Sequence, residues 1–264
     1  NMTFENKVVW ITGASSGIGK GLALKLSQQN CKLILSSRRQ DVLETVRQDC
    51  KNPEHVALVV FDLAAIDTMK NVAQKALSAF GTIDVLINNG GISQRSLIKD
   101  TDISVDKKLM EVDYLGTVAL TKALLPHFIK KQSGHIAVVT SIMGKFGSPY
   151  RSGYCGAKHA LHGFFDVLRM EHEKDNIKVT LVCPGFVNTN VAKNALVGDG
   201  TKNDTQDKAT EKGLSVAVFC KRMLRAITKE KHEVYIGKSE IRGVYLKRFF
   251  PKLLHKVVLK SKVR

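Results

Sequence analysis

The 264-residue sequence has no apolar run near the roughly 20 residues needed to cross a bilayer. Its five cysteines are odd in number and form no C-x-x-C pair, which favours packed, reduced thiols over a disulfide framework. An H-E-x-x-H motif or a Cys/His cluster is also missing, so we expect no metal site, and we read His159 and His162 as surface or packing residues. A strand-like run already begins at residue 7, which leaves no room for a signal peptide and predicts a cytoplasmic protein.

Acidic residues are scarce, since 24 Asp and Glu stand against 41 Lys and Arg and give a net charge of +17. They are absent from residues 241–264, where apolar and basic residues recur at helical spacing around Pro251, which we expect to break or kink the helix. A basic amphipathic helix is typical of a peripheral membrane segment, but such a tail can equally pack on its own domain or on a partner subunit. We expect no nucleic-acid binding, because no recognised binding module accompanies the charge.

Apolar runs rich in β-branched residues alternate with helical patterns along most of the chain. Strands are predicted at 7–12, 31–36, 56–61, 84–87, 136–140, 178–182 and 233–236. Helices are predicted at 20–30, 66–80, 104–131, 153–172 and 214–228, with Pro126 bending or interrupting the third. This alternation predicts an α/β fold, with a Rossmann-like, doubly wound parallel sheet as a single domain over residues 1–238 and a tail at 239–264. The polar stretch 197–212 is predicted to be a mobile loop of the kind that often covers an active site.

A glycine-rich turn joins the first predicted strand to the first predicted helix. Gly13, Gly17 and Gly19 have the spacing G-x-x-x-G-x-G, which departs from the general dinucleotide fingerprint G-x-G-x-x-G. A strand, a glycine turn and a helix in this order place backbone N–H groups and a helix N-terminus against a phosphate. The turn therefore indicates a nucleotide site, although a glycine turn without a ligand is the alternative.

Two arginines follow the second predicted strand, at the position where NAD-preferring dinucleotide folds normally carry an acidic residue. Arg38 and Arg39 would bind a ribose 2′-phosphate through their forked guanidinium groups, whereas a carboxylate would repel it. We therefore predict NADP(H) rather than NAD(H) as cofactor. The alternative is a pair of solvated surface arginines.

Tyr154 and Lys158 lie four residues apart on the predicted helix 153–172, so both side chains can point into one pocket. A lysine cation beside a tyrosine favours the phenolate and makes the hydroxyl a better acid. Ser141 follows the predicted strand 136–140, where its hydroxyl can hydrogen-bond a carbonyl oxygen above the sheet. Together the three residues predict proton donation to a substrate carbonyl, although Y-x-x-x-K alone occurs by chance on many helices.

Over about residues 5–238 these motifs, in this order, resemble the short-chain dehydrogenase/reductase family. Within the family the sequence is most similar to the animal dehydrogenase/reductase 7 group, chiefly over residues 114–134 and 142–160. The resemblance matches Ser141, Tyr154 and Lys158 to the catalytic residues. It implies cofactor contacts at the turn, at the adenine, at the N-N-A-G-like element 88–91 and beside the nicotinamide. The implied cofactor-binding residues are Gly13, Ser15, Ser16, Gly17, Ile18, Gly19, Arg38, Arg39, Asp62, Leu63, Asn89, Gly90, Tyr154, Lys158, Pro184, Gly185, Val187 and Thr189.

Asp113 is the main departure from the family pattern, which has an asparagine there to complete a catalytic tetrad. In the family that residue supports, at a helix bend, a water that links the lysine to a proton relay. An aspartate can keep the bend, but its charge would stabilise the ammonium of Lys158 and weaken the support that Lys158 gives to Tyr154. We expect Asp113 to be tolerated and to shift the pH optimum.

The expected function is an NADPH-dependent carbonyl reductase, or an alcohol dehydrogenase in the reverse direction. Its substrate would be a small-molecule ketone or secondary alcohol, of lipophilic character if residues 241–264 contact a membrane. The resemblance also implies a homodimer or homotetramer. Two alternatives stay open, namely a catalytically weak NADP(H) sensor and a membrane-recruited scaffold.

Overall fold

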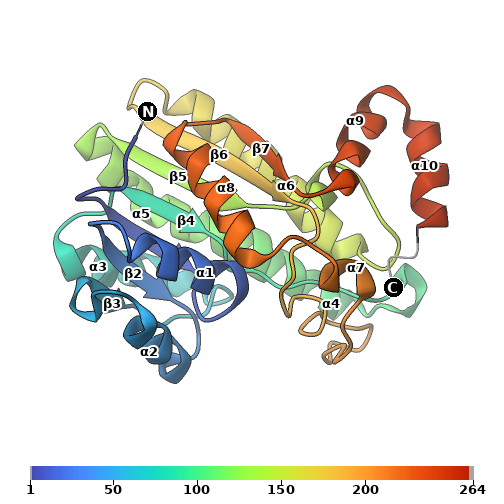
Figure 1. Cartoon of the computed structure of the whole chain (residues 1–264), viewed down its shortest axis with the longest axis horizontal. Helices are drawn as coiled ribbons and strands as arrows, with labels where there is room; N and C mark the ends of the chain where they lie inside the picture. Colours follow the sequence, from blue (N-terminus) through green and yellow to red (C-terminus); the bar gives the residue numbers. More distant parts are fainter. Residues whose placement is uncertain (1, 262–264) are drawn as a thin grey trace.

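The computed structural model describes residues 2–261 and contains one parallel sheet, in the strand order β3-β2-β1-β4-β5-β6-β7 (Figure 1). This confirms the predicted doubly wound α/β fold. The strands are β1 (Val8–Thr12), β2 (Lys32–Ser36), β3 (Val56–Leu58), β4 (Val85–Asn88), β5 (Gly134–Val139), β6 (Ile177–Pro184) and β7 (Glu233–Ile236).

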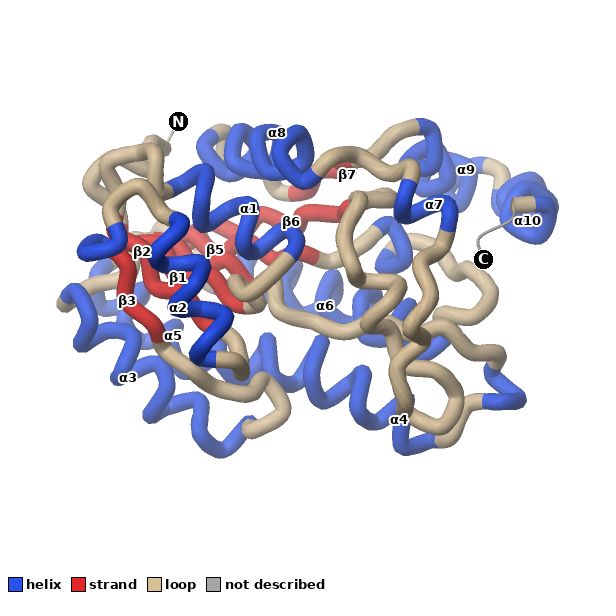
Figure 2. The backbone as a smooth tube through the Cα atoms, turned by 60° about the horizontal axis from the view of Figure 1, so that its bottom comes forward, coloured by secondary structure: helices blue, strands red, loops and turns tan. Residues whose placement is uncertain are grey.

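Helices cover both faces of the sheet (Figure 2). One face packs against α1 (Gly17–Leu26), α2 (Gln40–Asp49) and α8 (Val216–Thr228), and the other against α3 (Met69–Phe80), α5 (Thr117–Lys131) and α6 (Ser152–Glu171). Side chains alternate between the two cores, since Val9 and Ile11 of β1 belong to the first and Val8 and Trp10 to the second. All these β1 side chains are buried, as expected for a parallel sheet covered on both faces.

The long helix predicted at 104–131 is divided, although not at Pro126. It consists of α4 (Ile103–Leu109), a π-helical segment (Met110–Gly116) and α5, which continues through Pro126 to its end. The interruption places Asp113 in the interior, where its carboxylate accepts a hydrogen bond from the backbone N–H of Ile92. Short π-helical segments inside helices often lie at functional sites.

Two further elements depart from the sequence-based prediction. Helix α2 had not been predicted, and β3 ends at Leu58 rather than at residue 61. The predicted loop 197–212 contains the one-turn helix α7 (Lys208–Glu211) and is attached to the body of the protein through the buried Asp207. Arg95 donates a 2.8 Å hydrogen bond to that carboxylate, and the carbonyl oxygen of Gly198 accepts a 2.9 Å hydrogen bond from the N–H of Asp102, so this loop is held at more than one point.

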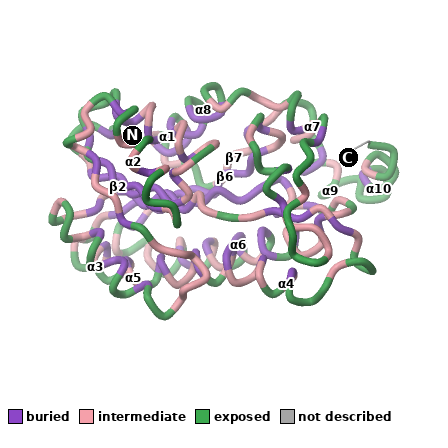
Figure 3. Tube along the Cα trace, turned by 90° about the horizontal axis from the view of Figure 1, so that it is seen from below, coloured by how far each residue is buried: buried purple, intermediate pink, exposed green. Residues whose placement is uncertain are grey.

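The C-terminal tail forms two helices, α9 (Arg242–Phe249) and α10 (Pro251–Lys260), and α10 begins at the expected break. Gly243 allows α9 to approach closely, because a Cβ there would lie only 2.6 Å from the Phe146 ring. Val244 and Leu254 are buried in a small apolar cluster with Ile142, Phe146 and Cys183. The tail thus packs partly on its own domain, while α10 lies at one end of the molecule and is largely exposed (Figure 3). Within residues 2–261 no helix is long and apolar enough to span a membrane.

Candidate active site

A cavity of about 1050 Å³ lies along the carboxyl ends of the central strands. It runs from the end of β2, past β1, β4 and β5, to the end of β6 and the tail helices. Every residue predicted to bind cofactor or to act in catalysis lines this cavity except Gly19 and Asp113. The motifs that are scattered along the sequence therefore meet in one place.

The glycine turn is shaped by close contacts between backbone segments. Gly13 and Gly17 have positive φ angles of 63° and 53°, and a Cβ at Gly19 would lie 2.1 Å from the carbonyl oxygen of Gly13. Gly19 thus lies behind the turn and allows it to close. Ser16 precedes α1, and its side chain makes no capping hydrogen bond. The first N–H groups of α1 are therefore left for an anion, as a dinucleotide pyrophosphate requires.

Asn89 and Thr12 fasten the glycine turn to the end of β4. The Thr12 hydroxyl oxygen accepts hydrogen bonds from the N–H groups of Asn89 and Gly90, each 3.0 Å long. In return the Asn89 side-chain amide donates to the carbonyl oxygens of Thr12 and Gly13, at 3.1 and 3.3 Å. The N-N-A-G-like element therefore supports the floor of the cavity as well as lining it.

The two arginines at the end of β2 are exposed and line the cavity. Neither Arg38 nor Arg39 makes an ion pair with any other residue in the described part of the chain. Asp62, also on the cavity wall, accepts a hydrogen bond from the N–H of Ala64 at 2.9 Å. This end of the cavity thus presents two guanidinium groups that are available to an anionic ligand.

Pro184, Gly185, Val187 and Thr189 lie at and beyond the end of β6 and form the wall between the glycine turn and the tail. Glu240, which the sequence analysis did not single out, fixes this segment. Its carboxylate accepts hydrogen bonds from the N–H of Phe186 at 2.9 Å and of Lys238 at 3.1 Å.

Ser141 and the Tyr154–Lys158 pair meet on the cavity wall from β5 and α6. Ser141 lies just beyond β5, and its hydroxyl oxygen accepts a 3.0 Å hydrogen bond from the N–H of Met143. The Lys158 ammonium lies 5.6 Å from the centroid of the Tyr154 ring and donates to the Val139 carbonyl oxygen at 3.3 Å. A hydroxyl, a phenol and an ammonium group thus line the same part of the cavity.

Asp113 lies behind Lys158, outside the cavity lining, with its carboxylate 3.5 Å from the ammonium nitrogen. Both side chains are buried. Burial raises the pKa of Asp113, and the neighbouring Lys158 offsets only part of that effect. Burial by itself would lower the pKa of Lys158, but Asp113 and Tyr154 outweigh it and hold the pKa above its ordinary value. Asp113 therefore influences the site through Lys158 and does not face the cavity itself.

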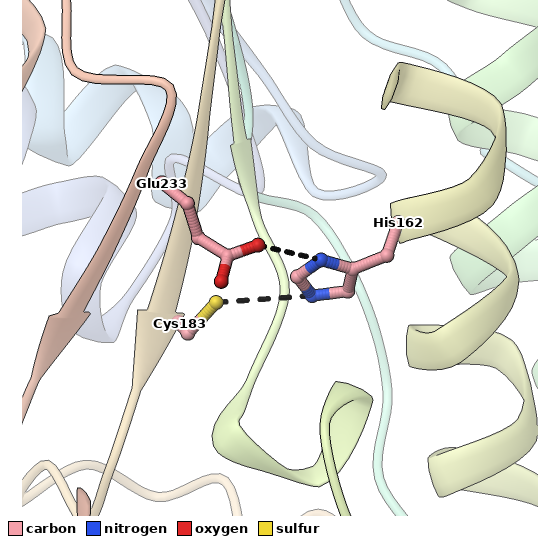
Figure 4. Close-up of side chains that lie close together, drawn as sticks. All are labelled: His162, Cys183 and Glu233. Atoms are coloured by element: carbon pink, nitrogen blue, oxygen red, sulfur yellow. Dashed lines mark hydrogen bonds and ion pairs between the residues drawn. The ribbon is translucent and has the colours of Figure 1, made fainter. Parts of the chain in front are cut away.

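A second cluster was missed by the sequence analysis, because its members come from α6, β6 and β7. Figure 4 shows the His162 ring facing both Cys183 and Glu233, which lie next to each other. One ring nitrogen, Nε2, lies 3.7 Å from the Cys183 sulfur, and the other, Nδ1, lies 3.2 Å from a Glu233 carboxylate oxygen. One ligand atom from each of the three residues lies within 4.8 Å of the other two, so the cluster has the ligand types and the spacing that could hold a metal ion, which the sequence analysis did not expect. Burial raises the pKa of the Cys183 thiol to about 12, so the thiol is neutral.

Glu233 is the anchor of this cluster. Burial alone would raise its pKa, but hydrogen bonds from His162, Tyr235 and Lys145 outweigh this effect and lower the pKa to about 2. The Lys145 ammonium lies 3.1 Å from the carboxylate, and Lys145 follows Ser141 by four residues. Glu233 thus connects the edge strand β7 to the segment that carries Ser141.

Known proteins with similar sequences extend over almost the whole chain. A family model described as short chain dehydrogenase matches residues 7–199. Dehydrogenase/reductase SDR family member 7B of Mus musculus is 40% identical over 260 residues, which are 96% of this chain and 80% of that protein. The dehydrogenase/reductase SDR family protein 7-like of Anopheles gambiae is also 40% identical, over 98% of this chain and 83% of its own.

Solved structures show the same fold at lower sequence identity. A short-chain dehydrogenase from Streptomyces avermitilis superposes with a TM-score of 0.82 at 24% identity, covering 97% of this chain and 98% of its own. A short chain dehydrogenase/reductase from Burkholderia phymatum in complex with NAD gives a TM-score of 0.84 at 20% identity, covering 100% and 98%.

Because Glu233 has a lowered pKa in the folded protein, we expect Glu233→Gln to reduce the free energy of unfolding at pH 7 by on the order of 2 kcal/mol. A carboxylate with a folded pKa of about 2, against an ordinary 4.5, stabilises the fold above pH 4.5 and loses this contribution as the pH falls toward 2. Urea unfolding at a series of pH values measures the difference between variant and wild type, which should shrink below pH 4.5. A difference that stays constant with pH would contradict the assignment, and Glu54→Gln, at an exposed position, is the control.

Proposed function

The chain belongs to the short-chain dehydrogenase/reductase family, and from this premise we propose that it is an NADPH-dependent reductase of ketones, or a dehydrogenase of secondary alcohols in the reverse direction. One observation carries the proposal. Ser141, Tyr154 and Lys158 line the same cavity as Arg38 and Arg39, with β1 and β4 lying between the two groups. The cavity thus combines a proton donor with a site for a phosphorylated dinucleotide.

The residues present fit a nicotinamide dinucleotide. The uncapped N-terminus of α1 and the glycine turn would hold the pyrophosphate, and Asp62 and Leu63 would lie at the adenine. When bound, the reduced cofactor supplies a hydride to the substrate carbonyl carbon. Pro184, Gly185, Val187 and Thr189 would hold the nicotinamide end.

The preference for NADPH rests on Arg38 and Arg39, which have no acidic partner of their own in the described chain. Guanidinium groups bind phosphate in a forked, charge-assisted geometry, so they favour the 2′-phosphate that distinguishes NADP(H). The Burkholderia protein that is bound to NAD is only 20% identical to this chain, so its ligand does not indicate which dinucleotide this chain binds.

In the proposed reaction Ser141 and Tyr154 hydrogen-bond the substrate carbonyl oxygen and orient it. As the carbonyl carbon is reduced, the oxygen takes the Tyr154 hydroxyl proton and becomes an alcohol. The Lys158 cation stabilises the phenolate that Tyr154 becomes, which then regains a proton from solvent. Asp113 holds Lys158 in place and moderates its charge.

The substrate end of the cavity supports a lipophilic ketone. Beyond the catalytic residues its wall includes the apolar residues Met143, Phe146, Phe186, Leu246, Leu254 and Val258, together with the charged residues Arg95, Arg151, Glu240 and Arg242. Burying a ligand of matching apolar surface there contributes roughly 25 cal/mol per Å² removed from water. Longer aliphatic chains should therefore bind more tightly.

A catalytically weak NADP(H) sensor is the second candidate, and one observation favours it. The ion pair between Asp113 and Lys158 diverts part of the lysine charge away from Tyr154. The intact set of Ser141, Tyr154 and Lys158 supports the reductase instead.

We also propose that the chain assembles as a homodimer or homotetramer through α6 and the preceding long helix. On this side Val167 and Met170 of α6 are 47% and 69% exposed, and Leu115 of the π-helical segment is 41% exposed. Apolar side chains that are this exposed on neighbouring helices favour burial in an interface. A monomer in sedimentation velocity would count against the assembly.

We expect Tyr154→Phe to lower turnover of NADPH with a ketone by roughly 10²- to 10⁴-fold, because the general acid is lost. NADPH affinity, measured by calorimetry, should stay close to wild type. Tyr114→Phe is the matched control, since its ring packs on Phe164 and does not line the cavity. A Tyr154→Phe variant that keeps most of its turnover would show that another group donates the proton.

We expect the double substitution Arg38→Ala/Arg39→Ala to raise the KM for NADPH by about 10- to 100-fold, since charge-assisted hydrogen bonds to the 2′-phosphate are lost. The KM for NADH should change little. The control is Arg47→Ala, an arginine of α2 that is paired with Glu44 and lies outside the cavity lining. An equal effect on both cofactors would refute the role assigned to the two arginines.

We expect Asp113→Asn to move the alkaline limb of the pH–rate profile for ketone reduction to lower pH, by about one unit. Removing the carboxylate takes away the charge that holds up the Lys158 pKa, so the ammonium loses its proton at lower pH and its support of the proton transfer from Tyr154 ends earlier. Glu111→Gln, in the same π-helical segment but paired with the exposed Lys107, is the control. An unmoved profile would remove Asp113 from the proposed mechanism.

A further inference from the structure

The two tail helices, called here the C-terminal hairpin (residues 242–260), expose large apolar side chains. Phe249, Phe250 and Leu259 are 68%, 63% and 64% exposed, and Tyr245 and Leu253 are at least half exposed. Figure 3 shows that exposure continues along most of α10. Such clustering on a short segment is typical of an interaction surface.

The charge of the hairpin limits what this surface can bind. Its exposed cations are Arg242, Lys247, Arg248, Lys252, Lys256 and Lys260, and it contains no acidic residue. None of the six forms an ion pair with another residue among 2–261. Aromatic residues among such cations complement an anionic lipid surface, where headgroups neutralise the cations and the acyl boundary takes up the rings.

The orientation of the hairpin is fixed by the catalytic domain. Gly243 lies directly against Phe146, and the ring of Tyr245 contacts that of Tyr235 edge-on at a centroid distance of 5.9 Å. Val244 is buried beside them. A surface that binds the hairpin would therefore lie in one fixed orientation relative to the catalytic domain.

The inner side of α10 forms part of the cavity wall. Leu254, Val257 and Val258 line the cavity, while Leu253 and Phe250, close to them in the chain, are exposed. The apolar lining of the substrate end thus continues into the exposed apolar surface of the hairpin.

We propose that the C-terminal hairpin docks on an anionic phospholipid bilayer and that the cavity opens toward the bilayer beside α10. A membrane-dissolved ketone would then enter without crossing water. The docking is inferred from the exposed residues of the hairpin alone, whereas the entry route for the ketone rests on the proposed reductase function.

The docking is tested by co-sedimentation with phosphatidylserine-containing vesicles and with phosphatidylcholine vesicles. Wild type should partition preferentially onto the former. Phe249→Ser/Phe250→Ser should weaken partitioning at least about tenfold, because two exposed rings that would enter the bilayer are lost, and Lys252→Gln/Lys256→Gln should weaken it about tenfold. The matched controls are Ile98→Ser/Ile103→Ser, at positions 78% and 81% exposed outside the hairpin, and Lys70→Gln/Lys75→Gln on α3.

The contact surface is located by fluorescence. Phe250→Trp should be quenched by brominated phospholipids in the vesicles, whereas Ile103→Trp should not. Trp10 is fully buried, so it contributes an unquenched background. Equal quenching at both positions, or equal partitioning of the hairpin and control variants, overturns the proposal.

Two further results distinguish membrane docking from self-association and from a failure of the reductase. If Phe249→Ser/Phe250→Ser lowers the sedimentation coefficient in the absence of vesicles, the C-terminal hairpin joins two copies of the chain. The lipid proposal then fails. The entry route predicts that these substitutions slow reduction of a vesicle-dissolved ketone but leave reduction of a water-soluble ketone unchanged. Loss of both rates would overturn the entry route. Absence of any reduction by wild type refutes the reductase, while vesicle binding still decides the docking.

Discussion

The nucleotide half of the molecule depends on one close approach, where the end of β1 meets the end of β4. A Cβ at Gly13 would lie 2.7 Å from the Cα of Gly90, so this contact tolerates no side chain. The strand order reverses between β1 and β4, so the connections that follow these two strands leave on opposite faces of the sheet. This opens the crevice in which doubly wound sheets bind ligands. The Thr12 hydroxyl oxygen also joins the two strand ends, because it accepts hydrogen bonds from two backbone N–H groups that follow β4. Backbone packing, more than side-chain chemistry, therefore shapes the floor of the site.

The interior charge pair of Asp113 and Lys158 is the feature that distinguishes the catalytic end. The carboxylate is held by one backbone N–H group and by the ammonium 3.5 Å away. A buried carboxylate of this kind is costly unless it is paired, so it fixes the lysine strongly. In the proposed mechanism, the same pairing that gives Lys158 its position would also reduce the charge that it can offer to Tyr154. Position and reactivity are thus set by a single contact.

Most of the fold and the lining of the candidate site could be predicted, because both depend on local patterns. The glycine turn, Ser141 after its strand and the Tyr154–Lys158 spacing each lie within a few residues, so their geometry follows from one strand or helix. The contact of Arg95 with Asp207 joins residues 112 apart, and His162, Cys183 and Glu233 come from three elements. The spacing of apolar residues along the sequence does not predict such pairings, because they form only when the fold brings distant elements together. The helix bend at Asp113 was implied by the family resemblance and not by the helical pattern, since tertiary contacts of Asp113 override a continuous helix there.

The position of α10 on the cavity wall has a consequence for how this protein can evolve. In the proposed reductase, proton donation and dinucleotide binding would depend on the sheet and on α6, whereas part of the substrate wall would come from α9 and α10. Changes in these two helices would then alter the size and polarity of that space without disturbing the strands that carry the proposed chemistry. Substrate range and catalytic chemistry can therefore diverge at different rates among relatives with this architecture.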